Sequence, residues 1–257
     1  MSQFIYYILF VGVVILVSWN MLDQDSVQKI PVDGYRLIWS DEFSGKSLDL
    51  SKWKYYQGKR KDAFNTGSQV FLDGSGFLHL QVKTSGDSVL AGMITSQHLF
   101  ESKYGYFECR AKLTNVMGIW PAFWLQSGSM AADYGTPETN GVEIDIFEYF
   151  PNFKKDTVTH NLHWGGYGIS HRELGLIPAP LQKTASDFHV FGLEWTDHSY
   201  TAYVDGKETA KGTDYISKVE QFIILSIECS GAAGPLDKTA LPADYVIDYV
   251  RVYKKNG

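Results

Sequence analysis

The stretch Val-Glu-Ile-Asp-Ile-Phe-Glu-Tyr at positions 142–149 places three carboxylates, Glu143, Asp145 and Glu148, within six residues. In an extended strand the side chains alternate between faces, so Glu143 and Asp145 share one face while the apolar residues take the other. Strict alternation turns Glu148 away, and one extra residue at 146–147, accommodated as a β-bulge, returns it. A helix is the competing interpretation, but the segment is rich in β-favouring residues and no convincing helix cap precedes it. The pattern predicts a bulged strand with three acids on one face.

Three like charges side by side destabilise a sheet, and the segment itself supplies no lysine or arginine to neutralise them. Such a set suits glycoside hydrolysis, which needs one carboxylate as nucleophile and one carboxylic acid that donates a proton across the scissile bond. A third acid between them can push the two pKa values apart. A solvated acidic strand and a divalent-metal site are the alternatives.

Five further segments resemble, in the same order along the chain, the sequence blocks of one enzyme family. They are Trp-Ser-Asp-Glu-Phe at 39–43, Lys-Tyr-Gly-Tyr-Phe-Glu at 103–108, Gly-Ile-Trp-Pro-Ala-Phe-Trp-Leu at 118–125, Phe-His-Val-Phe-Gly-Leu-Glu-Trp at 188–195 and Asp-Tyr-Val-Arg-Val-Tyr at 248–253. With the acidic stretch they cover nearly everything from Tyr35 to Tyr253. The chain thus resembles glycoside hydrolase family 16, in the bulged form typical of its laminarinase, agarase and carrageenase branches.

The resemblance implies a retaining endo-β-glycosidase acting by double displacement, with Glu143 as nucleophile, Glu148 as general acid/base and Asp145 as the assisting acid. The expected substrate is a β-linked polysaccharide, first a β-1,3- or mixed-linked glucan. An endo-β-galactanase or agarase-like activity and a non-catalytic, lectin-like carbohydrate-binding domain are the alternatives. Residues 132–141 and the loop 165–172 depart from the usual laminarinase pattern, so the exact polysaccharide stays open.

Many short strand-like runs separated by turn residues predict an all-β sandwich or barrel. The runs lie at 35–39, 77–82, 105–113, 120–125, 142–149, 158–164, 190–195, 200–204, 222–227 and 245–253. No segment shows a convincing helical period. The family resemblance narrows the prediction to a β-jelly-roll sandwich of two antiparallel sheets, like concanavalin A and the legume lectins, with a concave substrate cleft.

Aromatic residues near the acids are candidates for sugar binding, because their faces stack on the C–H face of pyranose rings. Trp120 and Trp124 fall on one face of a strand by period two, and Trp164 closes another strand. Core packing is the alternative for each. Family position implies that Trp120 walls the cleft beside the cleaved sugar.

Three polar residues complete the candidate substrate-binding set. His163 aligns with a family histidine of the active-site cleft, which places it against the substrate or Glu148; a structural histidine is the alternative. Glu108 and Arg110 lie on the non-core face of their strand and are predicted to line the cleft, with a solvated ion pair as the alternative.

Asp248 stands among valines on an otherwise apolar face, and a buried carboxylate needs a partner. Relatives in the family hold a structural calcium between the first and last strands, so Glu42 and Asp248 are candidate ligands. A hydrogen-bonded structural aspartate is the alternative. No cofactor is expected for catalysis.

A chain of 257 residues with a net charge of −6 fits one large domain and a neutral substrate, and argues against nucleic acid as a partner. We expect the catalytic domain at 35–257, a linker at 25–34 and a monomer. The apolar start at 1–24 predicts a signal peptide or, alternatively, a membrane anchor, and so an exported protein that is secreted, periplasmic or cell-surface. Cys109 and Cys229 are predicted to be buried free thiols, with a disulfide as the alternative.

Overall fold

The computed structural model describes residues 30–132 and 134–257. From Pro31 to Gly257 the chain forms one compact unit. The predicted signal peptide or anchor at 1–24 lies outside the described residues, so its fate and the export of the protein stay predictions. No helix in the described part is long and apolar enough to cross a membrane.

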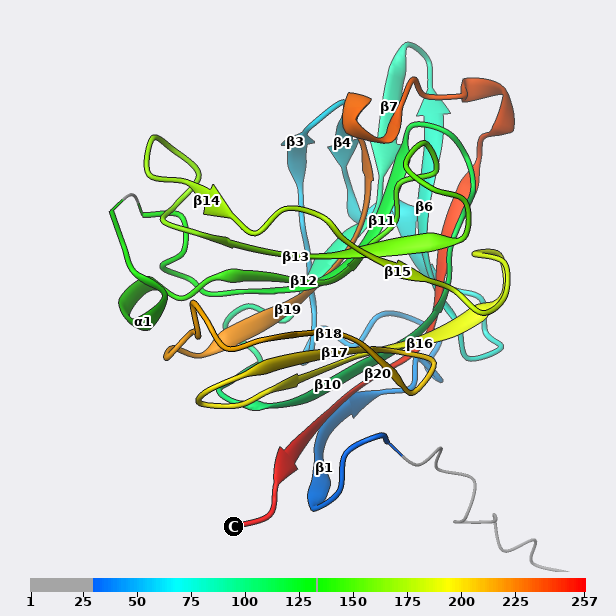
Figure 1. Cartoon of the computed structure of the whole chain (residues 1–257). Helices are drawn as coiled ribbons and strands as arrows, with labels where there is room; N and C mark the ends of the chain where they lie inside the picture. The colour runs from blue at the N-terminus through cyan, green and yellow to red at the C-terminus, as the bar shows by residue number, and fades with distance from the viewer. Residues whose placement is uncertain (1–29, 133) are drawn as a thin grey trace, which may run out of the picture. The chain divides into compact units, whose positions relative to one another are not determined.

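Two large sheets pack face to face and make up almost the whole described chain (Figure 1). The first sheet contains β1 (Tyr35–Asp41), β3 (Gly58–Arg60), β4 (Ala63–Asn65), β5 (Val70–Leu72), β6 (Leu78–Ser85), β7 (Ser88–Ala91), β10 (Gly105–Lys112), β16 (Phe188–Trp195), β17 (Tyr200–Val204), β18 (Lys207–Gly212) and β20 (Ala243–Lys255). The second contains β2 (Lys54–Tyr55), β8 (Met93–Thr95), β9 (Glu101–Ser102), β11 (Ile119–Gln126), β12 (Glu143–Glu148), β13 (Thr157–Trp164), β14 (Arg172–Glu173), β15 (Ile177–Pro180) and β19 (Gln221–Cys229). One short helix, α1 (Pro137–Asn140), precedes β12.

Neighbouring strands pair antiparallel throughout the described part, apart from the parallel pair β4 and β7. The first sheet runs β18-β17-β16-β10-β20-β6-β7-β4-β3, and the second runs β14-β13-β12-β11-β19-β8-β2. This architecture confirms the predicted all-β jelly-roll sandwich. All ten predicted strands are present, whereas strands such as β2, β9 and β14 were missed because two residues are too few to show an alternation.

The bulge predicted within β12 is confirmed by its register with both neighbours. Toward β11, Trp124 lies opposite Asp145 while the next residue back, Phe123, lies opposite Phe147, so Ile146 has no partner of its own. The register toward β13 shifts between Asp145 and Glu148. Both Ile146 and Phe147 point into the core, and this double step turns the following Glu148 outward.

The core between the sheets is built from large aromatic and aliphatic side chains that alternate inward along each strand. Phe147 is fully buried in this core, with its ring centroid 3.9 Å from that of Phe191. Cys109 and Cys229 are both buried and unpaired, which confirms the prediction of free thiols. The inner face of the nine-stranded sheet thus packs against this core, and its outer face carries the acids.

Candidate active site

The three acids of β12 meet on the outer face of the nine-stranded sheet. Glu143, Asp145 and Glu148 all line one hollow together with residues from β11 and β19. A larger pocket of about 560 Å³ adjoins it and shares Arg60, Trp124 and Glu143. We call the two together the cleft. The bulge produces the arrangement, because a regular strand would have turned the third acid into the core.

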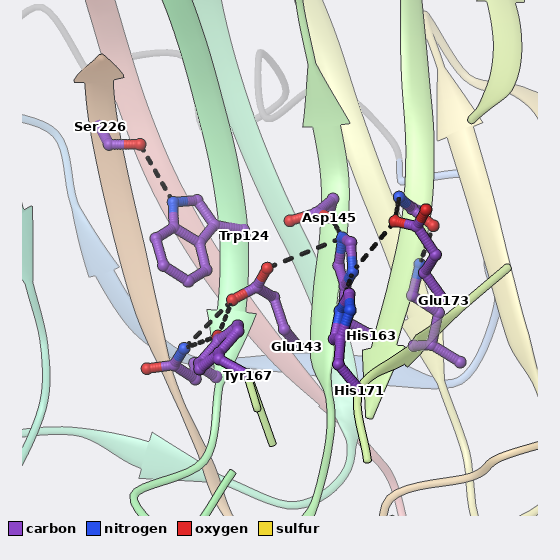
Figure 2. A network of polar contacts seen from close by, with 11 residues as sticks. Trp124, Glu143, Asp145, His163, Tyr167, His171, Glu173 and Ser226 are labelled. Atoms are coloured by element: carbon purple, nitrogen blue, oxygen red, sulfur yellow. Dashed lines mark hydrogen bonds and ion pairs between the residues drawn. The ribbon is translucent and has the colours of Figure 1, made fainter. Parts of the chain in front are cut away.

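Glu143 is held in position by two donors. Gln126 Nε2 donates to Glu143 Oε2 at 3.1 Å, and the hydroxyl of Tyr167 donates to the same oxygen (Figure 2). Burial raises the pKa of Tyr167, and the neighbouring Glu143 charge raises it further, so the phenol stays a donor. The other oxygen, Oε1, lies 3.8 Å from His163 Nε2. Hydrogen bonds thus fix one carboxylate oxygen of Glu143, and the other oxygen lies near the His163 ring.

Asp145 is almost fully buried, at 4% exposure, and its Oδ2 makes no hydrogen bond within the described structure. His163 Nε2 is 3.2 Å from that oxygen without meeting hydrogen-bond geometry. Burial raises the pKa of Asp145 well above its ordinary value, and the charges of Glu143 and Glu228 add to the effect. An aspartate in this position holds its proton well above the pH at which ordinary carboxyls release theirs.

Glu148 shares this environment at the far end of the strand. It is 5% exposed, and burial raises its pKa well above the ordinary value, followed by the charges of Asp145 and Glu143. His163 opposes the shift. A carboxyl group whose pKa is raised in this way keeps its proton to higher pH than an ordinary carboxyl and can donate it to a leaving group, which is the chemistry of a general acid.

Two tryptophans lie where the sequence predicted them. Trp120 and Trp124 line the hollow that contains the acids. Trp124 donates from Nε1 to Ser226 Oγ at 3.1 Å, which fixes its ring beside Glu143. Trp120 packs on Phe150, with ring centroids 4.9 Å apart, and stays partly exposed to the cleft. Their apolar faces give the cleft the surface that pyranose rings stack on.

Comparison with known proteins fits this geometry. Residues 57–251 match the family model described as glycosyl hydrolases family 16. The chain belongs to glycoside hydrolase family 16. As a member it is a glycoside hydrolase, and the resemblance inferred from the motifs is confirmed.

Three similar proteins show how far the similarity extends. A beta-glucanase of Rhodothermus marinus is 29% identical, over 93% of this chain and 92% of its own. A keratan-sulfate endo-1,4-beta-galactosidase of Sphingobacterium multivorum is 28% identical, over 86% of this chain and 55% of its own. Among solved structures, the laminarinase of Flavobacterium sp. UMI-01 superposes with a TM-score of 0.73 at 26% identity, covering 85% of this chain and 100% of that one.

Trp164 was predicted to bind substrate, and the structure contradicts this. The strand alternation that points His163 into the cleft turns the next residue to the opposite face. There Trp164 packs against the core and stacks on Tyr215, with ring centroids 3.9 Å apart. Trp164 thus packs on the core side of β13 and does not line the cleft.

The prediction that Glu108 and Arg110 line the cleft is also wrong. Both belong to β10, which lies in the other sheet and turns these side chains to the far outer face. Glu108 is 2% exposed and accepts a hydrogen bond from the Tyr249 hydroxyl at 3.1 Å. Arg110 pairs with Asp248. The prediction that both side chains leave the core was correct, but they lie on the sheet that does not carry the acids.

The side chains proposed as calcium ligands do not fit a calcium ion. Glu42 gives its two oxygens to Arg251, at 2.9 Å and 2.8 Å, and Asp248 pairs with Arg110. A bulge in β20 explains the misplacement: opposite β10 the register jumps from Tyr249 to Ile247, so Asp248 leaves the apolar face. Asp248 therefore has a salt-bridge partner, as the structural alternative anticipated.

Several residues of the cleft were not foreseen from the sequence. Arg60, at the end of β3, donates from Nε to Glu228 Oε1 at 2.6 Å, and its guanidinium lies 5.6 Å from the Trp124 ring. Glu228 and Gln126 follow the outward alternation of β19 and β11, so period two could have found them. Tyr167 lies in a loop, where no periodicity places a side chain.

A stability measurement tests the buried charge of Asp145. A folded-state pKa above the unfolded value means that stability is complete at low pH and falls as pH rises from about 4 through the folded pKa. We expect Asp145→Asn to be more stable than the wild type at neutral pH, because the amide carries no charge whose burial opposes folding. The difference should vanish below the ordinary carboxyl pKa, as measured by denaturant unfolding across pH.

Asp244→Asn is the matched control. Burial works against its ionisation, but hydrogen bonds from His79 and Gln81 lower the pKa of Asp244 overall. A lowered pKa contributes stability at neutral pH that is lost as pH falls through the folded pKa, so this variant should be less stable than the wild type. Equal destabilisation of both variants at neutral pH would show that Asp145 carries no buried-charge penalty.

Proposed function

We propose that this family 16 enzyme is an endo-β-glucanase that cleaves β-1,3- or mixed-linked glucan by double displacement with retention of anomeric configuration. The observation that carries the proposal is the bulge of β12, which sets three carboxyl groups along one wall of the cleft. The beta-glucanase and laminarinase relatives support a glucan as the substrate.

The different environments of Glu143 and Glu148 assign them different roles in the reaction. Glu143 attacks the anomeric carbon while Glu148, kept protonated by burial, gives its proton to the departing glycosidic oxygen. In the second step the Glu148 carboxylate takes a proton from water, and that water displaces Glu143 from the sugar. Retention by this route predicts that the two carboxyl groups work roughly 5–5.5 Å apart. Asp145 lies between them and sets their charge balance.

The hydrogen bonds of Glu143 assign its two oxygens. Oε2 accepts from Gln126 and Tyr167, so it is the oxygen that becomes the ester carbonyl and still accepts both bonds. Oε1 has no hydrogen bond within the described structure and is the oxygen that attacks. Two donors on one oxygen keep the nucleophile aimed before the substrate arrives, which lowers the entropic part of the barrier.

The walls of the cleft suit a neutral sugar chain. Apolar and aromatic side chains line the larger pocket, among them Tyr56, Trp124 and Phe222, alongside polar groups such as Gln97 and Gln126. Stacking surfaces with a few directional donors are typical of carbohydrate sites. The exposed Lys61, whose ammonium lies 5.7 Å from the Trp120 ring, supports a second candidate, an endo-β-galactosidase acting on an acidic or sulfated glycan.

A panel of polysaccharides separates the two candidates. Reducing ends released from laminarin, mixed-linked β-glucan, agarose and keratan sulfate would be measured with equal enzyme. We expect release from the two glucans in excess of the galactose-based polymers, with oligosaccharides as early products because cleavage is internal. Release from the galactose-based polymers alone reverses the order of the candidates, and binding by calorimetry with no turnover on any of them contradicts hydrolysis.

Proton NMR of the first products tests the stereochemistry. Double displacement predicts that the β-anomer forms first and that the α-anomer appears only by mutarotation. An α-anomer present from the first spectrum means single displacement. Glu143 could then no longer be the nucleophile, nor Glu148 its acid/base partner, whichever polysaccharide is cut.

A further inference from the structure

One wall of the cleft carries three side chains whose metal-ligating atoms converge. They belong to His163, His171 and Glu173, and one nitrogen or oxygen from each lies within 4.8 Å of the other two. His163 and Glu173 are directly paired across β13 and β14. The loop 165–171 joins these strands and brings His171 back over the pair, with its ring stacked on His163 at a centroid distance of 5.2 Å.

Two of the three spacings between these atoms are close to those of a tetrahedral ion site. His163 Nδ1 is 3.0 Å from His171 Nε2 and 3.4 Å from Glu173 Oε2. Ligands 2.0–2.1 Å from a tetrahedral zinc ion are roughly 3.3 Å from one another. These two distances lie within a few tenths of an ångström of that spacing, and the ligand atoms of His171 and Glu173 lie within 4.8 Å of each other. An adjustment of the exposed Glu173 side chain would therefore seat an ion where a hydrogen bond now joins the two imidazoles.

The surroundings orient the ligands for that purpose. His163 Nε2 faces the carboxylates Asp145 and Glu143, at 3.2 Å and 3.8 Å, which leaves Nδ1 aimed at the other two ligands (Figure 2). A histidine with a carboxylate behind one nitrogen and a metal on the other is the usual arrangement of such sites. Asn161 Nδ2 approaches Glu173 Oε2 at 3.4 Å and steadies the third ligand.

We propose that His163, His171 and Glu173 form a binding site for a divalent transition-metal ion of the zinc class. Two imidazoles and one carboxylate suit zinc, cobalt or nickel, whereas calcium and magnesium take oxygen ligands. Three protein ligands leave a fourth position for water. The ion ties the loop that carries Tyr167 to β13, beside the acids. The proposal is independent of which glycan the enzyme cuts.

Titration calorimetry with zinc chloride on the untagged full chain, stripped with a chelator beforehand, tests the site. We expect one equivalent of zinc to bind, and His171→Ala and Glu173→Gln each to weaken binding by on the order of tenfold or more. His198→Ala is the matched control, since this exposed histidine also lies beside a carboxylate, Asp197. It should bind zinc as the wild type does, and magnesium chloride should give no binding heat with any form.

Cobalt supplies a second readout that does not depend on heats. Cobalt bound by two imidazoles and a carboxylate in tetrahedral geometry gives visible absorption bands, which His171→Ala should lose while its thermal unfolding midpoint stays that of a folded chain. Zinc binding by the wild type no tighter than by His171→Ala, or an equal loss in His198→Ala, overturns the proposal. The contact is then a hydrogen-bonded pair of histidines only.

Discussion

Replacing Glu143 by glycine is expected to lower hydrolysis by on the order of 10⁴-fold or more, because no other group can form the glycosyl-enzyme ester. The loss of the glutamate side chain leaves space beside Gln126 and Tyr167 where a small anion fits. Azide should restore cleavage of an activated aryl β-glycoside. Its single displacement inverts the anomeric carbon, so the product should be the α-glycosyl azide, identified by NMR.

Glu220→Gly is the control for this experiment. Glu220 is exposed and precedes β19, outside the residues that line the cleft. Its glycine variant should retain wild-type hydrolysis and gain nothing from azide. A β-glycosyl azide from Glu143→Gly, or near-normal hydrolysis by that variant, would contradict the nucleophile assignment.

The acidic strand could be predicted because its chemistry and its periodicity point the same way. Alternation places Glu143 and Asp145 on one face, and only a bulge brings Glu148 to the same face. The chemistry needs the acids together, so it predicted a β-bulge, and the strand register shows that bulge. The same rule would have corrected Trp164, since its neighbour His163 already occupies the cleft face. Core-facing residues and strand bounds were predictable for the same reason, for they depend on local pattern alone.

Errors arose where the answer depends on non-local pairing. The alternation of β10 shows that Glu108 and Arg110 leave the core, but a sandwich has two outer faces, and only the strand order decides between them. Asp248 was misplaced by a bulge that no function signals. Tyr167 reaches Glu143 from a loop whose course follows from tertiary contacts, so its role was beyond any periodic argument.

The electrostatics of the cleft explain why three neighbouring acids are tolerated. Arg60 lies against Glu228 across the cleft floor and lowers the pKa of Asp145, in opposition to burial. Arg60 offsets only part of the effect of burial, so the pKa values of Asp145 and Glu148 stay raised. The two buried acids therefore lower the stability of the fold at the place where the reaction occurs. Sites of this kind are where activity and stability conflict, because removing the charge stabilises the fold and disables the reaction.

Glu148→Gln should separate the two halves of the reaction. Glutamine keeps the shape of the side chain and cannot donate the proton, so glucan hydrolysis should fall about 10²–10⁴-fold. An aryl glycoside with a good leaving group needs no proton, so its first step should continue and an initial burst of aryl alcohol should appear. A burst of aryl alcohol slowed as much as glucan hydrolysis would show that Glu148 positions the sugar and does not protonate the leaving group.

The pH dependence of activity is a second, independent test of Glu148→Gln. In the wild type, kcat/KM on glucan should fall at the alkaline side as Glu148 loses its proton, and the raised pKa of Glu148 moves that fall above the ordinary carboxyl range. Burial is the main cause of the raised pKa, with Asp145 and Glu143 adding to it. In Glu148→Gln the residual activity should lose this alkaline fall, because the titrating group is gone. An alkaline fall that persists unchanged would assign the proton to another group, and His163, 3.2 Å from Asp145, would be the next to replace.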